Sequence, residues 1–420
     1  MKTTLRYLAA MTLLALGQSA AHADDAALIK QGEYLARAGD CTACHTLKGG
    51  EEFAGGLAIH SPMGIIYSTN ITPDPEAGIG RYSEQEFADA VRKGVRRDGK
   101  HLYPAMPYPD YRGITDSDIH ALYVYFMKGV KPVAAKATAT DLMFPFNQRW
   151  GMAFWNFAFA EDKDYHPVTP ADLDRGKYLV ETLGHCGSCH TPRGIGMQEK
   201  ALNDSSDTYL SGGELNGWPV PALRGMPGWS VKDITDYLAT GRNDFAAVGG
   251  EMTGVVEHSM QHMSDPDLQA IAGYLKSLPA GPQVNYHRQD ADKATQQTVD
   301  TLTQGQNLSA GQLLYMNNCE ACHWTDGKGA KGIFPRLNGG DVVLEENPNA
   351  LINIILQGAE TPSTPKAPSV LTMPGFSHRL SNKQVADLAT FVRSGWGNNA
   401  PPVTEKDVRK VREAQEAEQK

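Results

Sequence analysis

The chain has 420 residues, which is enough for three domains of ordinary size. Hydrophobic residues make up 41% of it and charged residues 21%, so a wholly disordered chain is excluded. The 48 acidic residues outnumber the 39 basic ones and give a net charge of -9, which disfavours nucleic acid as a partner.

Residues 1–23 predict a secretory signal peptide. Two basic residues precede an apolar stretch over 8–16, and Ala21-His22-Ala23 is a small-x-small cleavage site. The stretch is too short for a membrane anchor, so we expect an exported chain that begins near Asp24. Losing the two basic residues takes its net charge from -9 to -11. No later apolar run approaches the ~20 residues that cross a bilayer, so we expect membrane contact to be peripheral or through a partner.

All six cysteines fall in three Cys-x-x-Cys-His motifs. This spacing is typical of c-type haem attachment, because residues at i, i+3 and i+4 share a helical face. Two thiols then reach two vinyl groups while the histidine points at the iron. A redox dithiol has no use for the histidine, and a zinc site needs cysteine pairs much closer together. We therefore predict three covalent haem c groups, with cysteine tethers Cys41, Cys44, Cys186, Cys189, Cys319 and Cys322 and axial ligands His45, His190 and His323.

Two helices repeat in the three thirds of the chain. Each middle helix has a capping residue, apolar residues four and eight later, and a glycine eleven later. These sets are Ser83, Phe87, Val91, Gly94; Ser230, Ile234, Leu238, Gly241; and Asn347, Leu351, Ile355, Gly358. Each closing helix begins after a cap at Thr115, Ser264 or Ser381. Leading helices before the cysteines carry Gly32, Gly176 and Gly311, which we expect to allow close helix packing.

The sixth ligand of each iron distinguishes an electron carrier from a haem enzyme, because an open iron can bind small molecules. Between the middle and closing helices lie Met106 in the first third and Met373 in the last. In the middle third, Met252 lies 11 residues after the helix-ending glycine, close to the spacings of 12 and 15 in the other thirds, whereas Met260 lies 19 after. We predict axial ligation by Met106, Met252 and Met373. Met260 stays open as an alternative, and His258 is the reserve candidate if Met252 is not the ligand.

Three further runs carry a family resemblance: Thr69-Asn70-Ile71-Thr72-Pro73-Asp74, Leu102-Tyr103-Pro104-Ala105-Met106-Pro107-Tyr108 and His185-Cys186-Gly187-Ser188-Cys189-His190-Thr191-Pro192-Arg193-Gly194. With them, nearly all of the mature chain resembles the three-haem cytochrome c subunit of bacterial membrane-bound dehydrogenases. That family serves gluconate, 2-ketogluconate, sorbitol, fructose or alcohol dehydrogenase complexes.

The resemblance implies the same cysteine, histidine and methionine roles. It also implies that a flavoprotein or quinoprotein catalytic subunit supplies the electrons, that a small third subunit accompanies it, and that membrane ubiquinone receives them. Pro221-x-Leu223 and Pro335-x-Leu337 resemble the element whose proline carbonyl orients the ligating imidazole. The first third shows no such proline.

We expect an all-α fold of three tandem cytochrome c-type domains, each wrapped around one haem. The predicted segments are the signal peptide over 1–23, domains over 24–150, 165–280 and 305–398, and a charged tail over 399–420. The tail is expected to be a solvated helix or a frayed end. The aromatic stretch over 150–159 is expected to contact a partner or a bilayer, or to pack between domains.

The predicted function is electron transfer on the periplasmic side of the bacterial inner membrane, from a dehydrogenase that oxidises a sugar acid, sugar or alcohol to ubiquinone. The chain shows no nucleophile elbow, phosphate loop or dinucleotide-binding turn, so we expect no substrate-oxidising site of its own. Two alternatives stay open, a free periplasmic multihaem shuttle and a haem enzyme with one open iron.

Overall fold

The computed structural model describes residues 25–160, 167, 170–215, 217–226, 228–280 and 291–418. The chain divides into two compact units: the first contains the residues up to 168 together with 178–185, and the second contains 169–177 and 186–420. The first Cys-x-x-Cys-His motif therefore belongs to the first unit, and the other two belong to the second. The predicted signal peptide lies outside the described residues.

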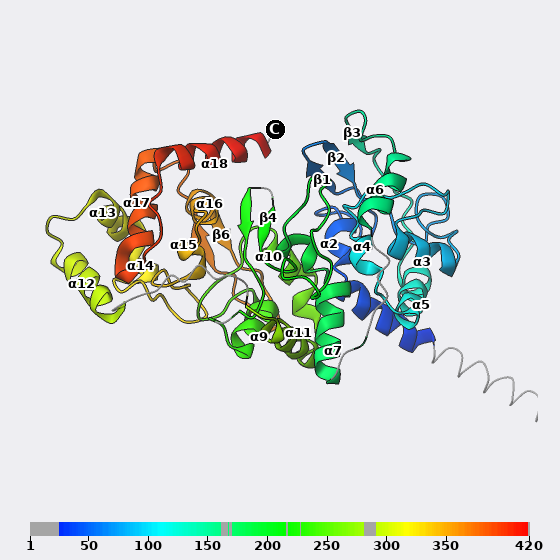
Figure 1. Ribbon diagram of the computed structural model, residues 1–420, viewed down its shortest axis with the longest axis horizontal. Coiled ribbons are helices and arrows are strands. Elements are labelled where there is room, and N and C mark those ends of the chain that lie inside the picture. Colours follow the sequence, from blue (N-terminus) through cyan, green and yellow to red (C-terminus); the bar gives the residue numbers. More distant parts are fainter. Residues whose placement is uncertain are drawn as a thin grey trace, which may run out of the picture. The chain divides into compact units, whose positions relative to one another are not determined.

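The first unit is mostly helical and places the first motif directly after a leading helix over 25–38 (Figure 1). Its further elements are α2 (Cys41–His45), β1 (Ala58–Ser61), β2 (Gly64–Tyr67), α3 (Glu84–Lys93), α4 (Tyr108–Tyr111), α5 (Asp116–Val124), η1 (Tyr125–Gly129), β3 (Asp141–Leu142), α6 (Gly151–Phe159) and η2 (Leu179–Leu183). The closing helix α5 continues into η1 as a turn of π-helix.

The second unit contains two sets of elements, and in each a leading helix and a motif precede a middle helix and a closing helix. Its first set is α7 (Ala171–Tyr178), α8 (Gly187–His190), β4 (Gly213–Leu215), β5 (Trp218–Val220), α9 (Val231–Thr240), α10 (Met252–His258), η3 (Met260–His262) and α11 (Asp265–Ser277). Its second set is α12 (Ala291–Gln304), α13 (Ala310–Asn318), α14 (Glu320–His323), α15 (Asp341–Leu344), α16 (Asn349–Gln357), β6 (Gly358–Glu360), β7 (Thr372–Pro374), α17 (Asn382–Ser394), η4 (Gly395–Gly397) and α18 (Glu405–Glu418).

Helices predominate, as predicted, but the described chain also contains three small antiparallel sheets that an all-α fold does not include. Strand β1 pairs with β2, with Ala58 opposite Tyr67, and β2 also pairs with β3. Strands β4 and β5 form a second sheet and β6 and β7 a third, in which Ala359 lies opposite Met373. These strands have two to four residues, which is too short for an alternating pattern to stand out in the sequence.

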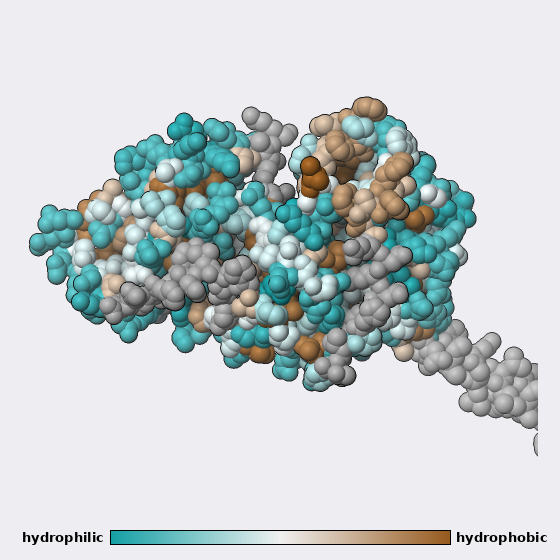
Figure 2. Space-filling model, in the orientation of Figure 1, coloured by the Kyte–Doolittle hydropathy of each residue, from teal (hydrophilic) through white to brown (hydrophobic). Residues whose placement is uncertain are grey.

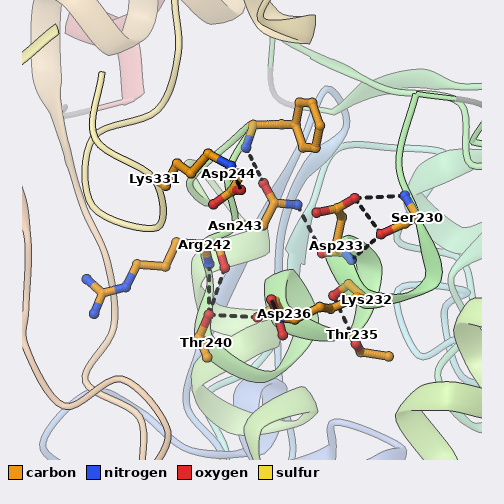
Figure 3. Close-up of polar contacts among 11 residues, drawn as sticks. Ser230, Lys232, Asp233, Thr235, Asp236, Thr240, Arg242, Asn243, Asp244 and Lys331 are labelled. Carbon is orange, nitrogen blue, oxygen red and sulfur yellow. Dashed lines mark hydrogen bonds and ion pairs between the residues drawn. The ribbon is translucent and has the colours of Figure 1, made fainter. Parts of the chain in front are cut away.

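The predicted helix caps are largely confirmed. Ser83 and Ser230 each form a capping box, and Figure 3 shows the second, in which Ser230 exchanges hydrogen bonds with Asp233. Gly94 and Gly241 adopt the left-handed conformation after α3 and α9. The caps of the closing helices, Thr115, Ser264 and Ser381, are confirmed as well. Asn347 was wrong as a cap, because α16 begins two residues later with Pro348 as its N-cap.

The three leading-helix glycines make the same close contact. A Cβ at Gly32 would collide with the carbonyl of Ala121, one at Gly176 with that of Ala270, and one at Gly311 with that of Asp387. In each case the contact lies on a closing helix, α5, α11 or α17. The prediction of close helix packing is confirmed.

The C-terminal residues pack on the third repeat. Helix α18 contacts α16 and α17 (Figure 1), and Val403, Val408 and Val411 are buried in the hydrophobic core there. The guanidinium of Arg412 donates to the carbonyls of Ser377 and Leu380. The expected helix is present, but one of its faces is docked rather than solvated, and its end is not frayed over the described residues. Within the described residues, no helix is both long and apolar enough to span a membrane.

Polar contacts join the two repeats of the second unit. The Lys331 ammonium pairs with the Asp244 carboxylate at 3.1 Å, as Figure 3 shows. The indole N–H of Trp229 donates to the Asp341 carboxylate at 2.8 Å. These contacts connect the segments on either side of α9 with the third repeat.

Candidate haem-binding sites

Each Cys-x-x-Cys-His motif forms a short helical turn. In the second motif the His190 N–H donates to the carbonyl of Cys186 at 3.0 Å. In the third, the His323 N–H donates to the carbonyl of Cys319 at 2.9 Å. The first motif is the five-residue helix α2, which begins at Cys41. Side chains at i, i+3 and i+4 then share one side of the turn, which suits two thioether bonds and one iron ligand.

Two of the thiols lack the low pKa of a reactive dithiol. None of the six cysteines forms a disulfide. Burial raises the pKa of Cys41 and of Cys319 to about 12, whereas a reactive dithiol requires a lowered pKa. In the part of the chain that the structure describes, no three His, Cys, Asp or Glu side chains form a group that could hold a metal ion.

A backbone carbonyl holds each motif histidine in place. The Nδ1 atoms of His45, His190 and His323 lie 2.6, 2.7 and 2.9 Å from the carbonyls of Thr69, Pro221 and Pro335. A carbonyl only accepts, so each Nδ1 carries the proton and leaves the Nε2 lone pair for a metal. Burial lowers the pKa of all three imidazoles, which favours the neutral form needed for ligation.

The contacts predicted for Pro221 and Pro335 are confirmed, and the structure adds Thr69 as their counterpart in the first repeat. A search for proline missed Thr69. The signal that survives in the sequence is the branched apolar residue two positions later, Ile71 in place of the leucine that follows each proline. What the three loops share is the position of a carbonyl oxygen, which any residue can supply.

A buried polar side chain anchors each carbonyl-bearing loop. In the first repeat Asn70 donates to the carbonyls of Val133 and Ala135 at 2.7 and 3.0 Å. In the second, Arg224 donates to the carbonyls of Pro279 and Tyr209 at 3.1 and 3.0 Å. In the third, Asn338 donates to the carbonyl of Asp326 at 3.1 Å. Sequence reasoning missed all three anchors, because each is a single polar residue in a loop.

The candidate methionines differ in how protein atoms surround them. Met106, Met252 and Met373 are each partly exposed, on the loop before α4, at the start of α10 and in β7. Met260 is 6% exposed and belongs to the protein core. Met252 is therefore the partly exposed candidate of the two, and Met260 is the core residue. His258 lies six residues after Met252 on α10, so it points from a different face of that helix.

An unusual carboxyl group adjoins the first motif. Asp40 has a left-handed backbone (φ 51°), and its Oδ1 is buried without a hydrogen-bond partner. Burial raises its pKa to about 8, and the nearby Arg37 lowers it only in part. Two other histidines make structural contacts. His101 contacts Asn156 at 3.3 Å, and the His185 ring lies edge to face with Tyr111 at 5.5 Å.

The residues present fit covalently attached haem. Each repeat combines two thiols at the right spacing that form no disulfide, one neutral imidazole oriented through Nδ1, and a partly exposed methionine further along the chain. Thiolate-derived thioethers, imidazole and methionine sulfur are the donor set of haem c with histidine and methionine ligation. The same set offers neither an acid-base pair nor an activated nucleophile.

The second and third repeats match the cytochrome c family model, over residues 173–279 and 308–396. The chain is 46% identical to the cytochrome c subunit of alcohol dehydrogenase (quinone) from Gluconobacter oxydans (strain 621H), covering 98% of this chain and 88% of that one. It is 49% identical to the gluconate 2-dehydrogenase cytochrome c subunit of Pantoea cypripedii, with 94% and 92% covered. It is 39% identical to the fructose dehydrogenase cytochrome subunit of Gluconobacter japonicus, with 91% and 82% covered.

Proposed function

Because the chain belongs to the family of cytochrome c subunits of alcohol, gluconate and fructose dehydrogenases, we propose that it carries three haem c groups and conducts electrons out of such a complex. The observation that carries the proposal is the threefold repeat of one local geometry: a Cys-x-x-Cys-His turn whose imidazole is held by a carbonyl at 2.6 to 2.9 Å.

In this proposal the chain's residues hold and tune the haems. Cys41 and Cys44, Cys186 and Cys189, and Cys319 and Cys322 form the thioether bonds. The histidines bind iron on one side and Met106, Met252 and Met373 bind it on the other. Haem iron supplies reversible one-electron oxidation and reduction. The carbonyls of Thr69, Pro221 and Pro335 fix the orientation and basicity of the imidazoles, and so contribute to the potential at each site.

We assign one haem to each of three domains, over 24–150, 165–280 and 305–398. The support is that each range contains one motif, one leading-helix glycine and one closing helix that this glycine contacts. Saturation of each iron from both sides by protein atoms favours outer-sphere electron transfer over the binding of a small substrate.

The proposed electron donor is a dehydrogenase catalytic subunit with a flavin or quinone cofactor, and the proposed acceptor is membrane ubiquinone. A small third subunit would complete the complex. The names of the three relatives support a sugar acid, sugar or alcohol as the substrate of the partner. The site of action would be the periplasmic side of the inner membrane, reached after removal of residues 1–23.

The decisive test is the number of haems and their reduction by a partner. The intact mass of the mature chain should exceed that of its polypeptide by three haems, and substrate-reduced dehydrogenase should reduce all three. A chain with no added porphyrin would refute the proposal. A five-coordinate haem in the wild-type chain would favour a haem enzyme, and a chain that never retains a dehydrogenase under mild extraction would favour a free shuttle.

A further inference from the structure

One residue separates the carbonyl-bearing residue of each repeat from the branched apolar residue that follows it. This residue is Asn70 in the first repeat, Ala222 in the second and Arg336 in the third. Asn70 is buried and Ala222 is exposed, and only Arg336 carries a charge. Arg336 directly follows Pro335, whose carbonyl lies 2.9 Å from Nδ1 of His323. A positive charge is therefore attached to the loop that supports the histidine of the third repeat.

The guanidinium of Arg336 is held by a residue of the second repeat. Its Cζ atom lies 4.5 Å from the centre of the Phe245 ring, which is a cation–π contact. The Nε atom of Arg336 is buried and has no hydrogen-bond partner among the described residues. Arginine stacks well on an aromatic face because its guanidinium is planar and weakly hydrated. The position of this charge therefore depends on Phe245.

Phe245 is fixed by the turn that follows α9. The amide oxygen of Asn243 accepts hydrogen bonds from the backbone N–H groups of Phe245 and Ala246 at 2.7 and 2.8 Å. The amide nitrogen of Asn243 donates to the carbonyl of Asp233 at 2.9 Å (Figure 3). The Trp229 ring stacks on Phe245, with 6.3 Å between ring centres and 22° between planes. The ring that contacts Arg336 is therefore part of an ordered aromatic pair in the second repeat.

One carboxyl group of the third repeat interacts electrostatically with Arg336. Burial raises the pKa of Asp341, and the hydrogen bond from Trp229 and the charge of Arg336 lower it only in part. The Trp229 indole N–H donates to this carboxylate at 2.8 Å. The carboxylate is thus bound by an indole while the guanidinium lies on a phenyl ring. Both charges of the third repeat therefore have an aromatic partner in the second.

We propose that the second repeat raises the reduction potential of the third haem through Arg336, a positioning residue that Phe245 holds beside the loop supporting His323. Ferric haem carries one more positive charge than ferrous haem, so a nearby cation favours the reduced state. Stacking on Phe245 keeps the guanidinium near this loop and shields one side of it from water, which weakens the screening of its charge. The inference rests on the proposed function, because it requires a haem bound at His323.

The test is a redox titration of the purified haem-loaded chain, followed by haem absorbance. The component that disappears in Cys319→Ala/Cys322→Ala identifies the third haem. Arg336→Gln should lower the ratio of reduced to oxidised third haem at a fixed potential by about tenfold, which is about 59 mV for a one-electron couple. Arg336→Lys keeps the charge and the cation–π contact, so it should change this ratio by less than about twofold. The other two haems should keep their ratios in both variants.

A second variant tests the role of the second repeat. Phe245→Leu leaves Arg336 in the chain but removes the ring that holds it, so the guanidinium turns toward water. The ratio of reduced to oxidised third haem should then fall by about threefold, because solvent screens the charge more strongly. This variant provides the measurement if Arg336→Gln does not fold. An unchanged ratio in Phe245→Leu would show that the second repeat has no part in the effect.

Lys331→Gln is the matched control, because it removes the same charge from the same loop. The Lys331 ammonium pairs with Asp244 of the second repeat at 3.1 Å, but its side chain is 79% exposed. Water screens this charge, so the ratio should change by less than about twofold. An unchanged ratio in Arg336→Gln, or an equal shift in Lys331→Gln, would overturn the inference. A wild-type chain without a third haem would instead refute the proposed function.

Discussion

The first and third repeats reach the same imidazole geometry by different routes. His323 meets the carbonyl of Pro335, 12 residues on, at 2.9 Å. His45 meets that of Thr69, 24 residues on, at 2.6 Å, and the hairpin of β1 and β2 lies in between. The longer loop is stabilised by Asn70, whose amide is fully used. The comparison teaches that the position of a backbone oxygen is what the two repeats share, while the residue that supplies it is free to change.

The two repeats differ more at their surfaces than at their helix crossings. The third is covered by α18, which buries Val408 and Val411. In the first, α6 follows the closing helix and leaves Phe154 and Phe157 exposed, and Figure 2 shows apolar residues gathered over this helix. The two repeats therefore share the same helix crossing but differ in how their outer apolar residues are covered. We expect their contacts with other molecules to differ as well.

The strongest test of the comparison removes the tethers of one repeat at a time. Cys41→Ala/Cys44→Ala and Cys319→Ala/Cys322→Ala should each lower the haem content from three to two per chain, because a haem without thioether bonds is not retained. Intact mass and the haem absorbance of the denatured chain measure this. A count of two in both the wild type and the first variant would mean that the first repeat, which lies outside the residues matched by the cytochrome c family model, holds no haem.

The next largest effect should come from the helix crossings. Gly32→Ala and Gly311→Ala should each lower the free energy of unfolding by about 3 kcal/mol, because the new Cβ collides with a backbone carbonyl and lies 2.5 or 2.8 Å from an aromatic Cβ. Thermal unfolding measures the loss. Gly273→Ala is the matched control, since it meets nothing within 4 Å on α11 and should stabilise by about 0.5 kcal/mol. A large loss in only one repeat would show that the crossings are not equivalent.

The middle repeat is tested through its two methionines. Met260→Ala should cost about 3 kcal/mol of stability and leave the near-infrared spectrum unchanged, because Met260 is a core residue. Met252→Ala should cost less stability but change that spectrum and lower the potential of one haem. The opposite pattern would transfer the ligand role to Met260.

The pH dependence of stability should separate the first repeat from the other two. The pKa of Asp40 is raised from 3.8 to about 8 in the folded chain, so between these values the folded chain binds a proton that the unfolded chain has released. The contribution of the Asp40 carboxyl to the free energy of unfolding therefore falls as the pH rises from about 4 to 8. Asp40→Asn should stabilise the chain by a few kcal/mol at pH 9 and little at pH 5, in thermal unfolding. An equal effect at both pH values would contradict a buried, protonated carboxyl.

The sequence allowed the repeated parts of the site to be predicted, and the structure supplied the parts that are unique to one repeat. Cys-x-x-Cys-His and the cap-to-glycine helices are local patterns that recur, so their spacing was readable. The roles of Thr69 and its anchor Asn70 could not be predicted in this way. A backbone carbonyl leaves no side-chain signature, and the loop is longer in the first repeat. The docking of α18 was missed for a related reason. Its apolar residues are few, and the many charges around them suggested a solvated helix.

The smallest expected effect tests whether the backbone carbonyl of Thr69, rather than its side chain, supports His45. Thr69→Val keeps the carbonyl and the β-branched shape of an exposed residue, so it should change stability by less than about 0.5 kcal/mol and leave the spectrum and potential of the first haem unchanged. Asn70→Ala keeps Thr69 but removes the amide that holds its loop, so it should cost about 2 kcal/mol and shift that potential. If Thr69→Val matched Asn70→Ala in both readouts, the threonine side chain rather than its backbone oxygen would support His45.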